Sequence, residues 1–504
     1  LALASSLDAQ ALRLDVRGGS YPGAISMQAG PGTLGRWASI LISASRGPTP
    51  LKWVDPRDSR VLSIGSESLH INWSGPFVTT SGTYKAAPLP VPNASFLLDG
   101  AVYFQAVTWP GPPKLPTLIA KVSNPIAVRF GPTMSFRDRG VGLAKERVYH
   151  TTTPLAGRRV IVIGGSTRPL SFGITALKTT EIYDEYTDTW SAGPNMAGLR
   201  CVHTATRLKD GRVLITGGLT NGPDAIDTCE VYDPKTNTIS ATAKLGTGRA
   251  LHSAVLLANG KVMVFGGFDK FDLTNPLATL NSILDSTEIW DPATGKWSFG
   301  RWMISARAEA VILPLLDGRI MVAGGAGWTK VFNVKIPTIW KTTEIYDPVS
   351  GNWAPGPSMN VERSFFRSCR MPKDRFLLAG GVNQVTLSNP GTPTTTAEIF
   401  DARSMTFKQV APMSWGRSLS HTYPLANGKY ITVAGAMGAI TAASALNNTE
   451  IYDEKADKWT MGPTLTAGRV WYEPFLNSTG QICLVSGGTG NNATPIATTE
   501  WLFR

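Results

Sequence analysis

One pattern recurs seven times between Arg147 and Arg504, and it restricts the chain to a small set of folds. Each copy opens with an arginine, continues through an apolar stretch to a glycine pair, and later reaches a glutamate followed by apolar and aromatic residues. The copies lie about 50 to 58 residues apart, which is the spacing of four-stranded propeller blades. The glycine pairs are assigned to Gly164-Gly165, Gly217-Gly218, Gly266-Gly267, Gly324-Gly325, Gly380-Gly381, Gly435-Ala436 and Gly487-Gly488.

The strand order within a blade follows from alternation and turn residues. In the second copy, residues 200–208 predict the inner strand, 209–212 a hairpin turn, 213–218 the second strand and 229–232 the third. A fourth, outer strand carries a large apolar side chain that we interpret as a seal against the next blade. This position is held by Trp190, Ile239, Trp297, Trp353, Phe407 and Trp459.

The seventh copy ends after its third strand, so its fourth strand must come from elsewhere. Residues 127–134 end in Gly-Pro-x-Met, as do the outer strands that contain Trp190 and Trp353. The sequence therefore predicts that strand 126–134 closes the ring by pairing with the last blade, which removes an exposed sheet edge.

These repeats resemble those of the kelch family, whose blades carry a glycine pair, a following strand with tyrosine and a later tryptophan. The resemblance covers about residues 125–504 and implies an all-β, seven-bladed kelch-type β-propeller. Residues 12–122 alternate in short runs separated by Gly/Pro-rich turns, which predicts a small β-sandwich domain before the propeller. The fold alone implies no activity, because propellers serve binding proteins and enzymes alike.

The composition indicates where the protein is located and which classes of partner it can bind. Residues 1–11 read either as the remnant of a removed signal peptide or as an N-terminal extension, and we expect a secreted or cell-surface protein. No apolar run is long enough to span a membrane. The net charge is +12, but the basic residues are dispersed, so nucleic acid is not an expected partner.

The four cysteines are isolated from one another rather than arranged in Cys-x-x-Cys pairs, which disfavours zinc. Buried thiols are the expected state of Cys201, Cys229, Cys369 and Cys483.

An arginine begins every inner strand and a glutamate lies in every third strand, which predicts a circle of structural ion pairs that ties the blades together. A ring of arginines around the channel is also a candidate anion site, although the matched glutamates would neutralise it. The arginines are Arg147, Arg200, Arg249, Arg307, Arg363, Arg417 and Arg469, and the glutamates are Glu181, Glu230, Glu288, Glu344, Glu398, Glu450 and Glu500.

Three of the five histidines, His150, His203 and His252, stand three residues after the arginine in consecutive blades. Three imidazoles at one channel mouth are weak candidates for a metal site. We favour hydrogen bonding to the backbone beside the channel, and we expect no metal and no cofactor.

The galactose-oxidase type of radical copper enzyme is similar in having a seven-bladed kelch propeller after a β-sandwich. Tyr149-His150 resembles its copper-binding Tyr-His pair, and Cys201 has the phase of its cross-linked cysteine. The order of the two is reversed, however, and Leu251 stands where the resemblance requires a tyrosine. The family's further histidine has no counterpart in this sequence. A copper oxidase is therefore the alternative function.

The longest loops join second to third strands, at 268–286, 326–341, 382–395 and 436–448, and they emerge on one face. Phe268, Phe271, Trp328, Phe332 and Trp340 make this face a candidate binding surface, unless the loops bury their own rings. We interpret the chain as a non-catalytic binding or assembly module for a protein, a second copy or a surface polysaccharide. Asp269, Asp272 and Glu309 are candidates for a glycosidase-like pocket, but the sequence does not place them together.

Overall fold

The computed structural model describes paired strands between Arg13 and Pro132, then residues 134–138, 140 and 142–503, except 273–274, 333, 386–390, 426–427, 439–442 and 479. The predicted N-terminal segment 1–11 lies outside the described residues. No helix in the described part is long and apolar enough to cross a membrane.

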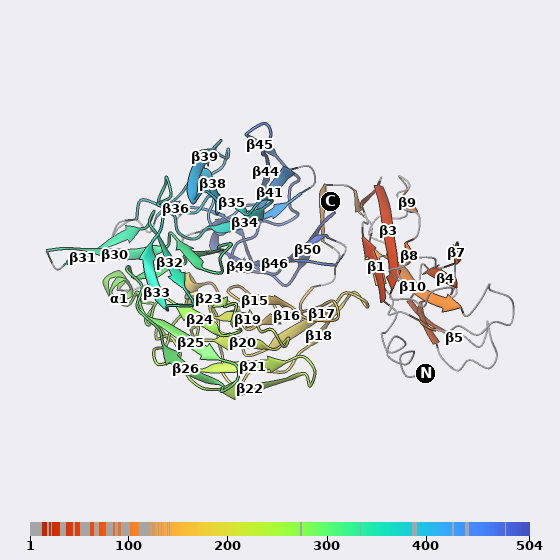
Figure 1. Ribbon diagram of the computed structural model, residues 1–504, viewed down its shortest axis with the longest axis horizontal. Helices are drawn as coiled ribbons and strands as arrows, with labels where there is room; N and C mark the ends of the chain where they lie inside the picture. Colours follow the sequence, from red (N-terminus) through yellow and green to blue (C-terminus); the bar gives the residue numbers. More distant parts are fainter. Residues whose placement is uncertain are drawn as a thin grey trace.

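The strands before the propeller pair among themselves and are drawn in red and orange in Figure 1. One sheet has the order β1-β3-β8 with β9 also on β3, and another has the order β11-β10-β4-β7 with β12 also on β10. Strand β5 pairs with β6, and β13 pairs with β2. A β-sandwich over 12–122 stays a prediction. The strands are β1 (Arg13–Arg17), β2 (Ser20–Tyr21), β3 (Gly23–Gly30), β4 (Trp37–Ser43), β5 (Arg46–Pro50), β6 (Val61–Ile64), β7 (His70–Pro76), β8 (Tyr84–Lys85), β9 (Leu89–Val91), β10 (Ala101–Trp109), β11 (Lys121–Val122), β12 (Ile126–Arg129) and β13 (Gly131–Pro132).

Beyond β13, seven of the sheets in the described residues are four-stranded and antiparallel, and they confirm the predicted all-β propeller (Figure 1). The first three blades are β15 (Thr151–Pro154), β16 (Arg159–Ile163), β17 (Thr180–Asp184) and β18 (Thr189–Ala192); β19 (Thr204–Arg207), β20 (Val213–Thr216), β21 (Cys229–Asp233) and β22 (Thr238–Thr242); and β23 (Ser253–Leu256), β24 (Val262–Phe265), β25 (Thr287–Asp291) and β26 (Lys296–Phe299).

The next three blades repeat this order, with the first strand of each innermost. They are β28 (Val311–Pro314), β29 (Ile320–Ala323), β32 (Thr343–Asp347) and β33 (Asn352–Pro355); β34 (Arg367–Met371), β35 (Arg375–Ala379), β38 (Ala397–Asp401) and β39 (Thr406–Val410); and β40 (His421–Pro424), β41 (Lys429–Val433), β44 (Thr449–Asp453) and β45 (Lys458–Met461). The seventh combines β46 (Glu473–Leu476), β47 (Ile482–Val485) and β50 (Thr499–Phe503) with β14 (Ser135–Asp138).

The ring closes by an N-terminal strand, but not by the predicted one. Strand β12 (Ile126–Arg129) pairs with β10, whereas β14 (Ser135–Asp138) pairs with β50. The Gly-Pro-x-Met match was misleading because this motif follows the outer strand in other blades and precedes β14 here. Phe136 lies opposite Leu502, in the register in which Trp190 lies opposite Tyr183. A phenylalanine therefore fills the seventh outer aromatic position.

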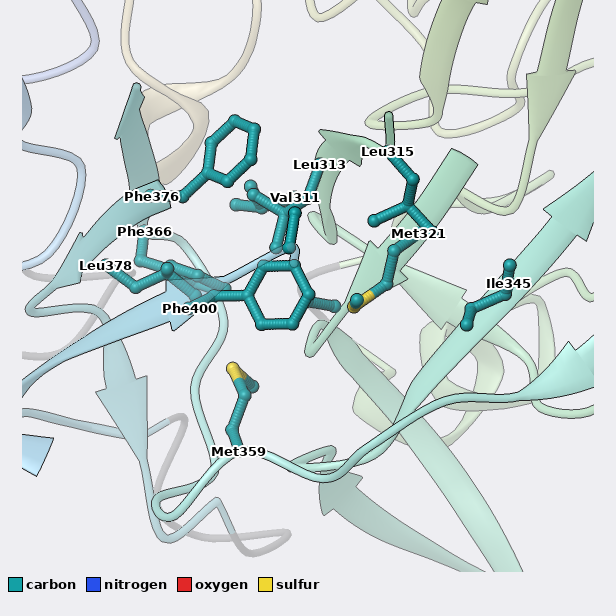
Figure 2. Packing of buried hydrophobic residues seen from close by; sticks show 12 residues of the cluster. Val311, Leu313, Leu315, Met321, Ile345, Met359, Phe366, Phe376, Leu378 and Phe400 are labelled. Atoms are coloured by element: carbon teal, nitrogen blue, oxygen red, sulfur yellow. The ribbon is translucent and has the colours of Figure 1, made fainter. Parts of the chain in front are cut away.

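The blades pack through apolar clusters at their interfaces. Figure 2 shows side chains of the fourth and fifth blades directed toward one another. Val311, Leu313 and Met321 of one blade meet Phe376 and Phe400 of the next in one buried cluster. The outer ring of Phe407 packs on the same cluster, so the outer aromatic position seals one blade against its neighbour.

The glycine pairs join each blade to the next. The second residue of each pair donates its N–H to the carbonyl of the arginine that begins the following blade, at 2.8 to 3.1 Å. The last of these bonds runs from Gly487 to Arg147 and completes the circle. Two assigned pairs were therefore one residue out of phase: the equivalent pairs are Ala434-Gly435 and Ser486-Gly487. The first position has φ near +50 to +70°, which Ala434 and Ser486 adopt, whereas the second has φ of +82 to +105°.

Because the second position suits only glycine, Gly487→Ala is expected to destabilise the propeller by about 2 kcal/mol or more. An added Cβ at Gly487 would lie 2.7 Å from the Cβ of Tyr472. Urea denaturation measures the change, and Ala434→Gly, at the first position, is the control, with an expected change below about 1 kcal/mol. Equal effects of the two substitutions would contradict the assigned phase.

The loops between second and third strands carry short elements of their own. They are the hairpin of β30 (Ala326–Val331) and β31 (Val334–Ile339), in which β30 also pairs with β27 (Arg307–Ala308); β36 (Val382–Asn383) with β37 (Thr392–Pro393); β42 (Ala436–Met437) with β43 (Ser444–Ala445); β48 (Gly488–Thr489) with β49 (Thr494–Pro495); helix α1 (Pro276–Asn281); and the 3₁₀ turns η3 (Leu170–Phe172) and η6 (Gly490–Asn492). The β30–β31 hairpin projects from the propeller at the left of Figure 1.

Candidate functional site

The arginine and the glutamate that recur at the same positions of every repeat form a buried ion pair in each blade. Arg363 shows the pattern: Nη2 donates to Glu398 Oε1 at 2.8 Å, and Nη1 donates to the carbonyls of Gly380 at 2.7 Å and Thr396 at 3.1 Å. Burial lowers the pKa of Arg363, and Glu398 opposes this shift. The other carboxylate oxygen accepts the backbone N–H of Asn360.

All seven predicted partners are brought together in this way. The pairs are Arg147–Glu181 at 2.6 Å, Arg200–Glu230 at 2.6 Å, Arg249–Glu288 at 2.8 Å, Arg307–Glu344 at 2.5 Å, Arg363–Glu398 at 2.8 Å, Arg417–Glu450 at 2.9 Å and Arg469–Glu500 at 3.1 Å. Each pair links the start of the inner strand to the third strand of the same blade, so the ion pairs act within blades, whereas the glycine-pair hydrogen bonds run from one blade to the next. Every arginine of this ring has its own carboxylate, so the ring offers no net positive charge to an anion.

The three in-phase histidines do not converge on one point. The His203 and His252 rings lie between two blades, against the first glycine of the preceding pair. The Nε2 atoms of His203 and His252 contact Thr151 Oγ1 and Thr204 Oγ1 at 3.0 and 2.9 Å. Burial lowers the pKa of His150 and of His252 to about 3, so both rings are neutral. In the part of the chain that the structure describes, no three His, Cys, Asp or Glu side chains are grouped to hold a metal.

The copper ligands implied by the oxidase resemblance are only partly assembled. Tyr149 and Cys201 share one apolar cluster, and the Tyr149 hydroxyl accepts the backbone N–H of Leu170 at 3.1 Å. Neither ring nitrogen of His150 has a hydrogen-bond partner among the described residues. Leu251 packs beside this cluster, where the resemblance requires a second tyrosine. The donors present do not fit a copper site.

The four cysteines are buried, and no disulfide joins any of them. Burial raises the pKa of Cys201, Cys229 and Cys369 to about 12. These thiols are therefore unreactive packing groups.

The channel holds a charged cluster that the sequence did not reveal. Arg367 Nη1 lies 3.1 Å from Glu309 Oε2, and Glu473 is close enough to influence the pKa of Arg367. Burial raises the pKa of Glu473 to about 7, with Arg367 opposing and Glu309 adding to the shift. Two adjoining cavities of about 410 and 290 Å³ share Glu309 and Arg367 in their linings. Asp269 and Asp272 instead lie in the loop around helix α1.

A repeat alignment would have found two of these residues. Four positions after the arginine, successive blades carry Thr151, Thr204, Ser253, Val311, Arg367, His421 and Glu473. Arg367 and Glu473 are the charged residues of this series, and four of the other five positions hold the small, uncharged residues Thr, Ser or Val. Glu309 stands two positions after its arginine, where the other six blades carry apolar or aromatic side chains.

Four of the five predicted loop-face rings pack within the loops. Phe268 is buried with Leu280 and Ile283, and Phe271 lies against Phe268 at 5.6 Å between ring centroids. Lys335 Nζ lies 3.9 Å from the centre of the Trp328 ring. Trp340 Nε1 donates to the carbonyl of Ala306 at 3.0 Å. The fifth ring, Phe332 at the tip of the β30–β31 hairpin, is 98% exposed.

The repeats match a known motif. A model of the kelch motif matches residues 147–197 and 249–301, which cover the first and third blades. The chain therefore carries kelch motifs, and its fold is a kelch-type β-propeller. No curated protein matches the chain.

Two solved structures are similar to the chain at low sequence identity. A fungal alcohol oxidase of the AA5 family, solved in complex with copper, is 15% identical, with a TM-score of 0.54 over 74% of this chain and 75% of that one. The structure of YjhT is also 15% identical, with a TM-score of 0.46 over 64% of this chain and 98% of that one. At this identity, the likeness to the oxidase shows the fold and nothing about activity.

Proposed function

We propose that this kelch propeller is a non-catalytic binding module, secreted or held at a cell surface, which contacts a protein partner through the β30–β31 hairpin. The observation that carries the proposal is the apolar tip of this hairpin. The exposed fractions are 98% for Phe332, 59% for Val334, 48% for Val331 and 41% for Ile336. Apolar side chains grouped at an exposed tip mark an interaction site.

The chemistry of the tip favours a protein over a polysaccharide. Sugar rings stack on open aromatic faces, but the Trp328 ring carries Lys335 and the Trp340 ring lies 5.8 Å from the Arg307 guanidinium. What remains exposed is aliphatic, with Phe332 as the one aromatic ring among the described residues of the hairpin tip. Such a surface is desolvated best by an apolar groove of another protein.

Two further features support a location outside the cytoplasm. Asn447 and Asn492 belong to Asn-x-Ser/Thr sequons and are exposed, as glycosylation requires. Localisation is tested directly by fractionating the source cells and detecting the chain in the medium or surface fraction.

The contact is tested by placing a photo-crosslinking amino acid at position 332 of the full chain in its native source. The control is position 349, because Val349 is 96% exposed in the same blade, in the turn between β32 and β33. We expect a discrete adduct from position 332 and none from 349. An adduct of two 54.0 kDa chains would identify self-assembly, and a different mass a second protein.

The adduct should disappear when Val331→Asp and Val334→Asp are added, because both introduce charge at the apolar tip. Light scattering of the untreated protein should show the corresponding assembly. Equal crosslinking at positions 332 and 349, or an adduct that survives the two aspartates, would contradict the proposal.

A further inference from the structure

The described lining of the 290 Å³ channel cavity contains two carboxyl groups, those of Glu309 and Glu473, and one guanidinium, that of Arg367. Arg367 is the guanidinium of the cluster, and its ion pair is with Glu309. The Glu473 carboxyl has no hydrogen bond or ion pair in the described part of the chain, although it lines the 290 Å³ cavity. The imidazoles on the same cavity wall are uncharged, because burial keeps the pKa of His150 and His252 near 3. The cavity therefore lacks one positive charge.

Part of the lining of this cavity is aromatic and apolar. Tyr149, Trp471 and Leu251 line it, and the Tyr149 and Trp471 rings meet edge to face at 4.8 Å between centroids. Phe365 supports Trp471 from behind at 6.0 Å. Aromatic rings attract cations through the negative potential of their faces, and alkyl groups on the cation add apolar contact.

We propose that the propeller channel binds a small organic ammonium ion between the Tyr149–Trp471 wall and the Glu473 carboxyl. The ammonium would supply the missing charge, and its carbon substituents would contact the aromatic wall. A hydrated metal ion suits this cavity less well, because no three ligating side chains converge within the described residues. The site is independent of the hairpin proposed above as the protein contact.

Binding of an ammonium ion beside Glu473 should release a proton from the Glu473 carboxyl. The titratable groups around Glu473 are Arg367 and Glu309, Tyr423 on β40, and the three histidines that line the same cavity, His150, His203 and His252. With a pKa of about 7, Glu473 is protonated at low pH and must ionise to pair with a cation. Affinity should therefore rise about tenfold per pH unit below pH 7 and level off above it. At pH 6, binding should release close to one proton.

The experiment is titration calorimetry of the full chain with choline and with ethanolamine, at pH 6 and pH 8 and in two buffers of different ionisation enthalpy. A control ligand is the neutral isostere of choline in which carbon replaces nitrogen. We expect choline or ethanolamine to bind at millimolar concentrations or below, more tightly at pH 8, and the neutral isostere to bind at least tenfold more weakly.

Glu473→Gln should lose at least tenfold in affinity together with the pH dependence, whereas Glu146→Gln, an exposed site with the same charge change, should keep both. Circular dichroism checks that both variants fold, and Trp471→Leu provides a second test of the cavity wall, because it should weaken choline more than ethanolamine. Failure of both ammonium ions to bind, equal binding of the neutral isostere, or unchanged binding by Glu473→Gln would overturn the proposal. So would calcium binding in place of ammonium.

Discussion

Arg363→Met is expected to lower the free energy of unfolding by about 3 to 5 kcal/mol, because Glu398 would be left as a buried carboxylate without its guanidinium. Both side chains are fully buried, and their ion pair measures 2.8 Å. The substitution also removes the donors to the carbonyls of Gly380 and Thr396. Urea denaturation of the full chain measures the loss as a lower midpoint.

The control is Arg319→Met, which breaks an ion pair with Asp317 whose side chains are 42% and 51% exposed. Solvent screens such a pair, so its loss should cost no more than about 1 kcal/mol. The double variant Arg363→Met with Glu398→Met should recover part of the loss, because no unpaired charge remains. If Arg363→Met costs no more than Arg319→Met, the buried pairs do not stabilise the blades as described.

Phe136→Ala should destabilise the chain by about 3 to 5 kcal/mol, since it leaves a cavity at the strand that closes the ring. Phe136 is 7% exposed and packs in one cluster with Ile431, Val433 and Leu502. The loss should be largest in the seventh blade, because the strand partner of β14 in this sheet is β50. Hydrogen exchange of the β50 amides should therefore accelerate.

Phe299→Ala offers a matched comparison. Phe299 also lies on a fourth strand, β26, but it is 69% exposed, so its removal should change stability by less than about 0.5 kcal/mol. Unchanged exchange at β50 in Phe136→Ala would show that β14 does not hold the ring closed.

The repeat predicts most of the propeller because each signal reports a local requirement. The arginine, the glycine pair and the glutamate recur because every blade builds the same hydrogen-bonded centre around a buried guanidinium. The predicted glycine pairs were shifted by one residue in the sixth and seventh blades. There the first position of the pair is Ala434 or Ser486, which adopt a positive φ although they are not glycine. The Ser486 hydroxyl compensates by accepting the backbone N–H of Arg147 at 3.0 Å and donating to its carbonyl at 2.7 Å.

The channel and the loops were harder to predict because they depend on three-dimensional placement. Glu309, Arg367 and Glu473 come from three blades, and only the closed ring turns them toward one cavity. The five loop-face rings look alike in sequence, yet Phe268 is buried and Phe332 is exposed. The difference arises because helix α1 covers one, while a hairpin carries the other away from the propeller.

The bonds at the seam also set the order in which this protein can be completed on the ribosome. Arg147 N pairs with Ser486 Oγ across 339 residues, and β14 pairs with β50 across a still longer stretch. The first strand of the ring therefore leaves the ribosome long before its partner exists and spends the intervening synthesis as an unpaired edge. Contacts of such high sequence separation also slow folding. A nascent chain of six blades would thus hold both ends of an open ring, and only the arrival of β50 would let them meet.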